Sequence, residues 1–163
     1  MNYHKIDKCS ISNGIGFRVV LWVSGCSHHC DGCHNPETWD KESGIAFEQN
    51  DWYKIARELE HPYISGITYS GGDPLFPANR LIITSMAKTI RQLYPDKTQW
   101  LYTGYDFSEV KDLEIMKYID VLVDGEYIDS KRDTSLPFRG SANQRLIDVQ
   151  KSLLNKTVIL LDI

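Results

Sequence analysis

Apolar, strand-like segments alternate with amphipathic segments along most of this chain, and this alternation restricts the fold more than any other feature. β-Branched and aromatic runs predict strands at residues 17–24, 64–70, 98–103 and 119–125, with a further one at 157–163. Apolar residues at helical spacing predict helices at residues 51–60, 79–93 and 107–118. Strands that alternate with helices are typical of βαβ units and a mostly parallel sheet, so the sequence predicts an α/β fold.

The size of the chain limits how far such a sheet can extend. Its 163 residues suit one domain, spanning residues 1–163, with a substantial core. A complete eight-stranded parallel barrel takes about 250 residues, so we expect an incomplete, shortened parallel β/α barrel. An open barrel leaves a lateral gap that suits a macromolecular substrate. The helical stripes predict core positions at Ile55, Leu59, Ile82, Met86 and Ile90, with Leu93 on the same face as the last three.

Charge and hydropathy exclude several classes of partner. With 18 basic and 22 acidic residues the chain has a formal net charge of -4, and no basic run stands out. A nucleic-acid partner therefore gets no electrostatic support. The first residues lack the apolar core of a signal peptide, and no apolar run approaches the length of about 20 residues that a membrane helix needs. We therefore expect no membrane association and a cytoplasmic location, where clustered cysteines are more often ligands or catalysts than disulfides.

The stretch that begins at Gly25, GCSHHCDGCHNPETW, contains three of the four cysteines and three of the five histidines. Its CDGCH segment matches the attachment motif for a c-type haem, but haem attachment requires export and leaves Cys26 unused. A redox dithiol of Cys30 and Cys33 also leaves Cys26 idle. A zinc site could use the three cysteines and one histidine, although zinc ribbons usually draw their ligands from two knuckles and this chain has one. The histidines available for it are His28, His29 and His34.

An iron–sulfur cluster fits the cysteine spacing better than these alternatives. Thiolates are the soft ligands that such clusters need, and three cysteines in one short loop can hold three irons of a cubane. The fourth iron then lacks a protein ligand, which in an enzyme leaves a coordination position open for a substrate. Cys9 lies upstream of a strand that must first cross the sheet, so we expect a small, half-buried residue there rather than a fourth ligand.

A second unusual loop, Gly71-Gly72-Asp73-Pro74, follows the predicted strand at residues 64–70. Its composition is compatible with a simple turn. Paired glycines at a strand end also let the backbone approach a ligand closely. Because chemistry in α/β folds collects at the carboxyl ends of strands, we expect this loop and the cysteine loop to form one site.

The wider sequence resembles a known family. The spacing Cys26-x3-Cys30-x2-Cys33 is the signature of radical S-adenosylmethionine enzymes, and further segments match one family within them, the activating proteins of anaerobic ribonucleoside-triphosphate reductase. These segments are MNYHKI, NGIGFR, VSGCSHHCDGCHN, TYSGGDPL, LYTGY, VDGEY and FRGSANQR. The chain departs from the family pattern at Ile15, His34 and Phe138, where many relatives have proline, tyrosine and tryptophan, and in a longer tail after Arg145.

The resemblance implies a radical S-adenosylmethionine fold, a 4Fe-4S cluster and S-adenosylmethionine as cofactor. It implies that the cluster is held by Cys26, Cys30 and Cys33. It further implies that Gly71, Gly72 and Asp73 bind the methionine amino group, and that Gly32, Cys33 and His34 lie against the nucleoside. The implied activity is reductive cleavage of S-adenosylmethionine to form a glycyl radical on the partner protein. That partner is the large catalytic subunit of the reductase, and the electron donor is a protein such as reduced flavodoxin.

Weaker candidates and two alternative functions remain. Residues 124–127 lie at the end of a predicted strand and could line the cleft, and residues 139–141 and 143–145 could contact substrate or partner. The turn at residues 13–16 precedes a strand, so it is not a dinucleotide-binding fingerprint.

The first alternative function is another radical enzyme of the superfamily, with a small substrate or a different glycyl-radical partner. The second is a zinc-binding interaction module without catalysis.

Overall fold

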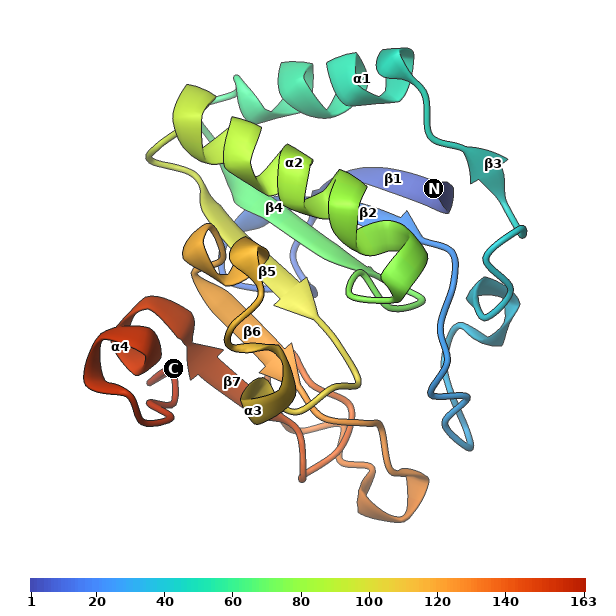
Figure 1. The fold of residues 1–163 in the computed structure, drawn as a ribbon, viewed down its shortest axis with the longest axis vertical. Helices are drawn as coiled ribbons and strands as arrows, with labels where there is room; N and C mark the ends of the chain where they lie inside the picture. The colour runs from blue at the N-terminus through green and yellow to red at the C-terminus, as the bar shows by residue number, and fades with distance from the viewer.

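Seven strands form one open sheet, with helices covering the face that is turned toward the viewer in Figure 1. The computed structural model describes all residues, 1–163. The strands are β1 (Asn2–Ser10), β2 (Phe17–Val23), β3 (Ile45–Ala46), β4 (Ile64–Gly71), β5 (Thr98–Tyr102), β6 (Val121–Asp124) and β7 (Arg145–Asp148). The helices are α1 (Gln49–Leu59), α2 (Pro77–Leu93), α3 (Phe107–Val110) and α4 (Val149–Asn155), with short 3-10 turns η1 (Pro36–Thr38), η2 (Glu114–Lys117) and η3 (Asp129–Lys131).

The strand order is β3-β1-β2-β4-β5-β6-β7. The four central strands, β2, β4, β5 and β6, are parallel to one another. β1 and β7 pair antiparallel with the outer two of these four. The predicted α/β class is confirmed, and the parallel arrangement holds for the central strands only.

Two predicted elements are wrong in detail. The helix expected at residues 107–118 is broken into α3 and η2, because Leu113 is extended (ψ 141°), and the restart at Glu114 buries both Ile115 and Met116. The strand expected at residues 157–163 is reduced to one bridge, between Leu160 and Ile147. The sequence interpretation also missed β1, β7 and α4.

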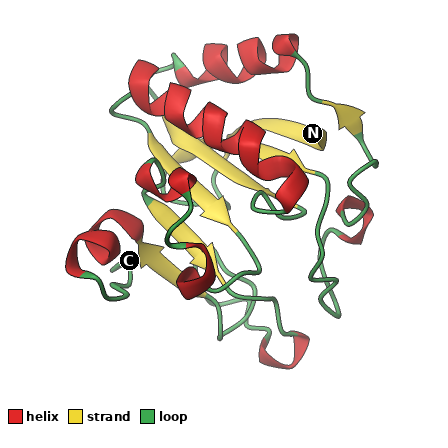
Figure 2. Cartoon of the chain, in the orientation of Figure 1, coloured by secondary structure: helices red, strands yellow, loops and turns green.

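The core lies between the sheet and the two long helices (Figures 1 and 2). Ile55 and Leu59 of α1 are fully buried, as predicted, and the α2 positions expected in the core at Met86 and Ile90 are buried as well. Ile82 is only partly buried, because Ile83 and Ala87 face the sheet instead, and Leu93 is 60% exposed at the end of the helix.

The amino ends of the central strands are closed around a buried arginine. Arg18 of β2 donates hydrogen bonds to Thr68 Oγ1 (2.8 Å) and Thr98 Oγ1 (2.9 Å), and its guanidinium lies over the ring of Trp100. Burial lowers the pKa of Arg18 to about 10. A Cβ at Gly14 would lie 2.8 Å from both the Arg18 side chain and the Trp100 ring. The predicted turn at residues 13–16 is therefore needed to pack this end of the sheet.

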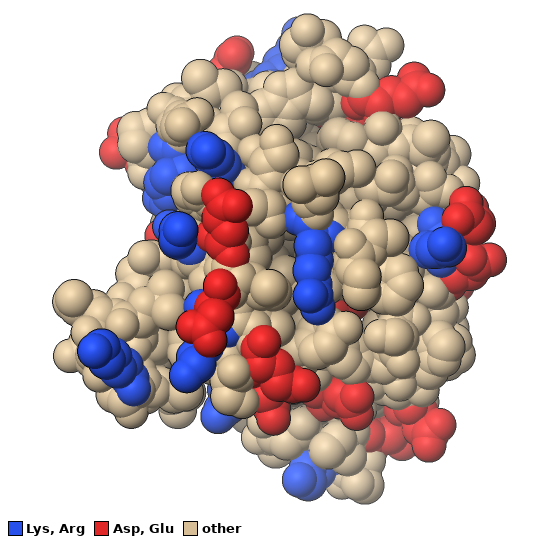
Figure 3. Space-filling model, viewed as in Figure 1, with Lys and Arg blue, Asp and Glu red and all other residues tan.

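The surface of the molecule has charged side chains of both signs (Figure 3). At the left and right of the face shown in Figure 3, lysine and arginine side chains lie next to aspartate and glutamate, whereas acidic side chains predominate along its lower part. No helix of the fold combines the length and the apolar character needed to cross a membrane.

Candidate functional site

The cysteine loop follows β2 and the GGDP loop follows β4, so both leave the carboxyl ends of adjacent parallel strands. They meet at the same edge of the sheet, at the lower right of the molecule in Figure 1. A cavity of about 540 Å³ lies there, within the range of ordinary ligand pockets. The predicted site residues that line it are Cys26, Cys30, Cys33, His34, Gly71, Gly72 and Asp73. The expectation that the two loops share one cavity is confirmed.

The three cysteines of the loop are free thiols, each partly buried. Burial raises the pKa of the Cys26 thiol to about 11 and also raises that of Cys30. Three soft sulfur donors facing one cavity are a suitable donor set for an iron–sulfur cluster. As the chain stands, no three His, Cys, Asp or Glu side chains are arranged to enclose a metal ion, so the thiols would have to turn toward a common point. Cys9, expected to be half-buried, is exposed on β1.

The two glycines allow the GGDP loop to pack against the start of the cysteine loop. Gly72 N–H donates to Val23 O at 2.7 Å, and Asp73 N–H donates to Gly25 O at 2.8 Å. A Cβ at Gly72 would lie 2.6 Å from that same Gly25 carbonyl, and one at Gly71 would lie 2.6 Å from the Val23 backbone. The close approach that the structure shows for this glycine pair is one of backbone to backbone, and the predicted approach to a ligand stays a prediction.

The Asp73 carboxylate is almost completely buried and fully engaged by the protein. It accepts hydrogen bonds from Thr103 Oγ1 (2.9 and 3.0 Å), Gly104 N–H (3.0 Å) and Leu75 N–H (2.7 Å). His28 Nε2 lies 3.0 Å from its second oxygen. The role of this segment in binding an amino group stays a prediction, in which Asp73 holds the loop in place.

His28 joins three segments that are far apart in the sequence. Its Nδ1 lies 2.8 Å from Glu126 Oε1, its Nε2 contacts Asp73, and its ring meets Tyr105 edge-on with the centroids 4.6 Å apart. A Cβ at position 104 would lie 2.5 Å from the ring, so Gly104 makes room for it. The hydrogen bond to Asp73 is the main cause that raises the pKa of His28 to about 9. The sequence indicates His28 only as one of three histidines available to a zinc site, and no motif predicts these contacts.

The comparisons with known proteins agree with this site. A family model described as a 4Fe-4S single cluster domain matches residues 12–147. The anaerobic ribonucleoside-triphosphate reductase-activating protein of Enterobacteria phage T4 is 45% identical over 146 residues, which cover 90% of this chain and 93% of the relative. Proteins with the same name from Vibrio cholerae serotype O1 and Escherichia coli K12 are 43% and 41% identical over 148 residues, which cover 88% of this chain and 96% of each relative.

The chain belongs to the family of anaerobic ribonucleoside-triphosphate reductase-activating proteins. The resemblance inferred from the sequence motifs is thus confirmed. The match to a 4Fe-4S domain supports an iron–sulfur cluster over the zinc, haem and redox-dithiol interpretations of the sequence.

Among the other residues predicted for this site, some line the cavity and some do not. Gly32 does not line the cavity; its φ of 72° suits glycine, and a Cβ there would lie 2.8 Å from Asp129 Oδ1. His34 is exposed and meets Tyr127 edge-on at 6.0 Å. Gly125 and Tyr127 line the cavity, as do Arg139, Gly140 and Gln144.

Asp124, also considered for the cleft, instead stabilises the fold. Its buried carboxylate accepts from Phe107 N–H at 2.8 Å and from Arg145 Nε at 2.9 Å, and it forms an ion pair with Arg145. It therefore holds the start of α3 and strand β7 against β6.

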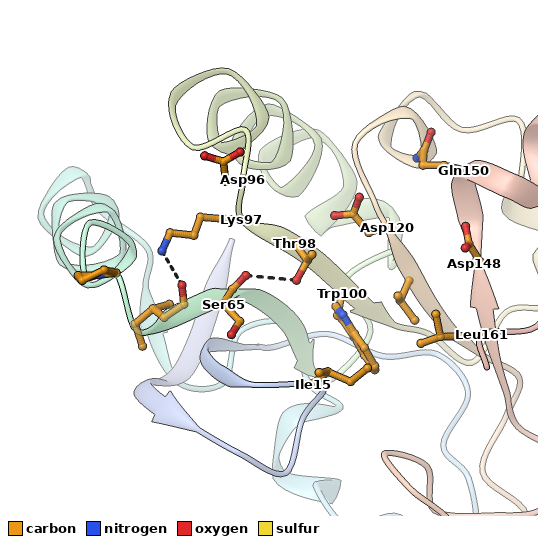
Figure 4. A pocket seen from close by; sticks show the side chains of 13 residues that line it. Ile15, Ser65, Asp96, Lys97, Thr98, Trp100, Asp120, Asp148, Gln150 and Leu161 are labelled. Carbon is orange, nitrogen blue, oxygen red and sulfur yellow. Dashed lines mark hydrogen bonds between the residues drawn. The ribbon is translucent and has the colours of Figure 1, made fainter. Parts of the chain in front are cut away.

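A second cavity, of about 630 Å³, lies at the opposite ends of the central strands (Figure 4). Its Asp120 carboxylate accepts from Gln99 N–H and Arg91, while its Asp148 carboxylate caps α4 and pairs with Lys151. Lys97 donates to the main-chain carbonyl of Ile64. These side chains hold neighbouring elements together, and the cavity contains none of the cysteines.

Proposed function

We propose that this chain activates an anaerobic ribonucleoside-triphosphate reductase by forming a glycyl radical on the large catalytic subunit of that enzyme. The observation that carries the proposal is the meeting of three thiols and the GGDP loop in one cavity, in a chain 45% identical to a protein named as the reductase-activating protein. The reaction consumes one electron and S-adenosylmethionine, releases methionine and 5′-deoxyadenosine, and removes one hydrogen atom from a glycine Cα.

The cysteine loop holds the cluster through Cys26, Cys30 and Cys33. When bound, a 4Fe-4S cluster with one iron free of protein ligands supplies a low-potential electron and a coordination position for S-adenosylmethionine. The protein holds the cofactor beside it, since orientation supplies much of the acceleration. Gly71, Gly72 and Asp73 form the binding segment for the methionine amino group. Gly32, Cys33 and His34 form the side of the site next to the nucleoside.

We further propose that the open sheet is a shortened barrel of the radical S-adenosylmethionine type, formed by one domain. The cavity lies at the carboxyl ends of the strands, and the sheet is not closed into a full barrel. That opening gives a glycine-bearing segment of the reductase a path to the site. The electron comes from a cytoplasmic donor such as reduced flavodoxin.

The proposal is tested by anaerobic incubation of the cluster-loaded protein with S-adenosylmethionine, a reductant and the reductase. We expect a glycyl radical in the electron paramagnetic resonance spectrum of the reductase, and transfer of deuterium from the labelled glycine Cα into 5′-deoxyadenosine. Cofactor cleavage without a radical on the reductase would favour a different radical enzyme of the same superfamily. Radical formation without deuterium transfer would exclude direct abstraction.

A further inference from the structure

Residues 125–144 form a long connection that lines the active cavity, and several hydrogen bonds fix its shape. Tyr102 Oη donates to the carbonyl of Phe138 at 2.8 Å. The Gln144 side chain accepts from Gly140 N–H at 2.9 Å and donates to Gly125 O at 3.1 Å. Arg139 lies between two of these fixed positions, and its side chain lines the cavity that also contains the three cysteines.

Arg139 is the unusual residue of this connection, because one donor of its side chain, Nε, is shielded from solvent without a partner. The other arginines at the sheet are paired: Arg145 with Asp124, and Arg18 with two threonines. Arg139 is half-buried, and a shielded N–H donor without a partner costs stability, so a ligand in the cavity that supplies an acceptor would remove this cost.

Two further observations support a ligand rather than a chance orientation. The chain has three buried side-chain atoms without a hydrogen-bond partner: Trp39 Nε1, Arg139 Nε and Asn143 Oδ1. Two of them, on Trp39 and Arg139, line this one cavity, and Asn143 is next to Gln144, which also lines it. Native proteins leave few such atoms, so their concentration at one cavity is informative. The nearby Asp133 carboxylate makes no ion pair with Arg139: its pKa is lowered chiefly by the hydrogen bond from the Ser135 hydroxyl (2.6 Å), and the charge of Arg139 adds a smaller effect.

We propose that Arg139 binds the carboxylate of the methionine part of S-adenosylmethionine, an inference that rests on the proposed function. A guanidinium presents a planar pair of N–H donors that matches a carboxylate and binds it in a bidentate manner. The carboxylate is the anionic group of this cofactor. The contact orients the methionine end, which in turn fixes the distance of the sulfonium from the cysteine loop.

The test compares S-adenosylmethionine with its decarboxylated analogue, on anaerobic, cluster-loaded protein, by isothermal titration calorimetry. Arg139→Gln should weaken binding of S-adenosylmethionine at least tenfold, the size of effect expected for a charge-assisted hydrogen bond. It should leave binding of the decarboxylated analogue unchanged. Arg139→Lys should recover part of the loss. The matched control is Arg132→Gln, an exposed arginine of the same connection, which should behave as the unmodified protein.

A structural role for Arg139 predicts different results. It would weaken both ligands equally and lower the midpoint of thermal unfolding of the ligand-free protein, whereas removal of a donor without a partner should not lower that midpoint. Equal weakening, or no weakening, would overturn the inference. The inference would also be overturned if Arg139→Gln weakened only the binding of the reductase and not that of S-adenosylmethionine. If the unmodified protein bound neither adenosyl ligand, the proposed function would fail as well, whereas unaltered binding by Arg139→Gln would contradict the role of Arg139 alone.

Discussion

Replacing His28 tests the most connected side chain of the cysteine loop. The imidazole bonds to the buried Asp73 carboxylate at 3.0 Å and to the Glu126 carboxylate at 2.8 Å. Hydrogen bonds to charged groups contribute about 1.5–3 kcal/mol when buried, whereas a pair with an exposed carboxylate contributes about 0–1 kcal/mol. Since Glu126 is 57% exposed, most of the effect comes from Asp73. We expect His28→Ala to lower the free energy of unfolding by about 2–3 kcal/mol.

The loss of unfolding free energy in His28→Ala should depend on pH, and the direction of this dependence follows from the pKa of His28. The folded-state pKa of His28 is raised to about 9, chiefly by the hydrogen bond to Asp73, from about 6.5 in an unfolded chain. A raised pKa gives stability that is fully present below about 6.5 and is lost as the pH rises through about 9. The difference between the unmodified protein and His28→Ala should therefore be largest at pH 6 and should shrink by pH 9.5.

Urea denaturation of the reduced, metal-free protein at several pH values measures this difference. His29→Asn is the matched control, because His29 packs on Trp39 without a hydrogen bond and asparagine tolerates its φ of 48°. A stability loss that does not change between pH 6 and pH 9.5 would refute the charged hydrogen bond. An equal loss in His29→Asn would show that any change in this loop has the same cost.

Two other substitutions test the cluster and the sheet. Alanine at any one of the three loop cysteines should abolish the full iron and sulfide content after reconstitution, and Cys9→Ala should not; full iron in Cys30→Ala would contradict the three-ligand site. Gly66→Ala should destabilise the protein by about 3 kcal/mol or more, because a Cβ there would lie 1.8 Å from the Thr98 carbonyl and separate β4 from β5. Thermal unfolding measures this loss, and an unchanged midpoint would show that the strand shifts without cost.

The sequence predicted closely those strands and helices whose own residues show a clear apolar pattern. The strand at residues 64–70 is a β-branched run next to glycines, and α1 has a regular apolar stripe, so both were predicted closely. β1 was missed because its charged residues, such as Lys5 and Asp7, give no clear alternation, and its pairing with β2 is decided by tertiary contacts. The break at Leu113 was missed for a related reason, since burial of Ile115 and Met116 overrides the helical pattern.

The parts of the candidate site that belong to short sequence motifs could be predicted from the sequence. The cysteine spacing and the glycine pair placed the two loops at one cavity. His28 gave no such signal, because its polar partners Asp73 and Glu126 are 45 and 98 residues away in the chain. Arg139 belongs to a motif that the sequence singled out, but only the structure shows that its Nε has no partner.

The contact between His28 and Gly104 has a consequence for how the family varies during evolution. Any side chain at position 104 would collide with the imidazole, with a Cβ only 2.5 Å from the ring. A relative that replaces this glycine therefore has to lose or move the histidine at position 28, which leaves the buried carboxylate at position 73 short of a donor. Positions 28, 73 and 104 should consequently vary together across homologues, as a correlated set spread over three separate motifs.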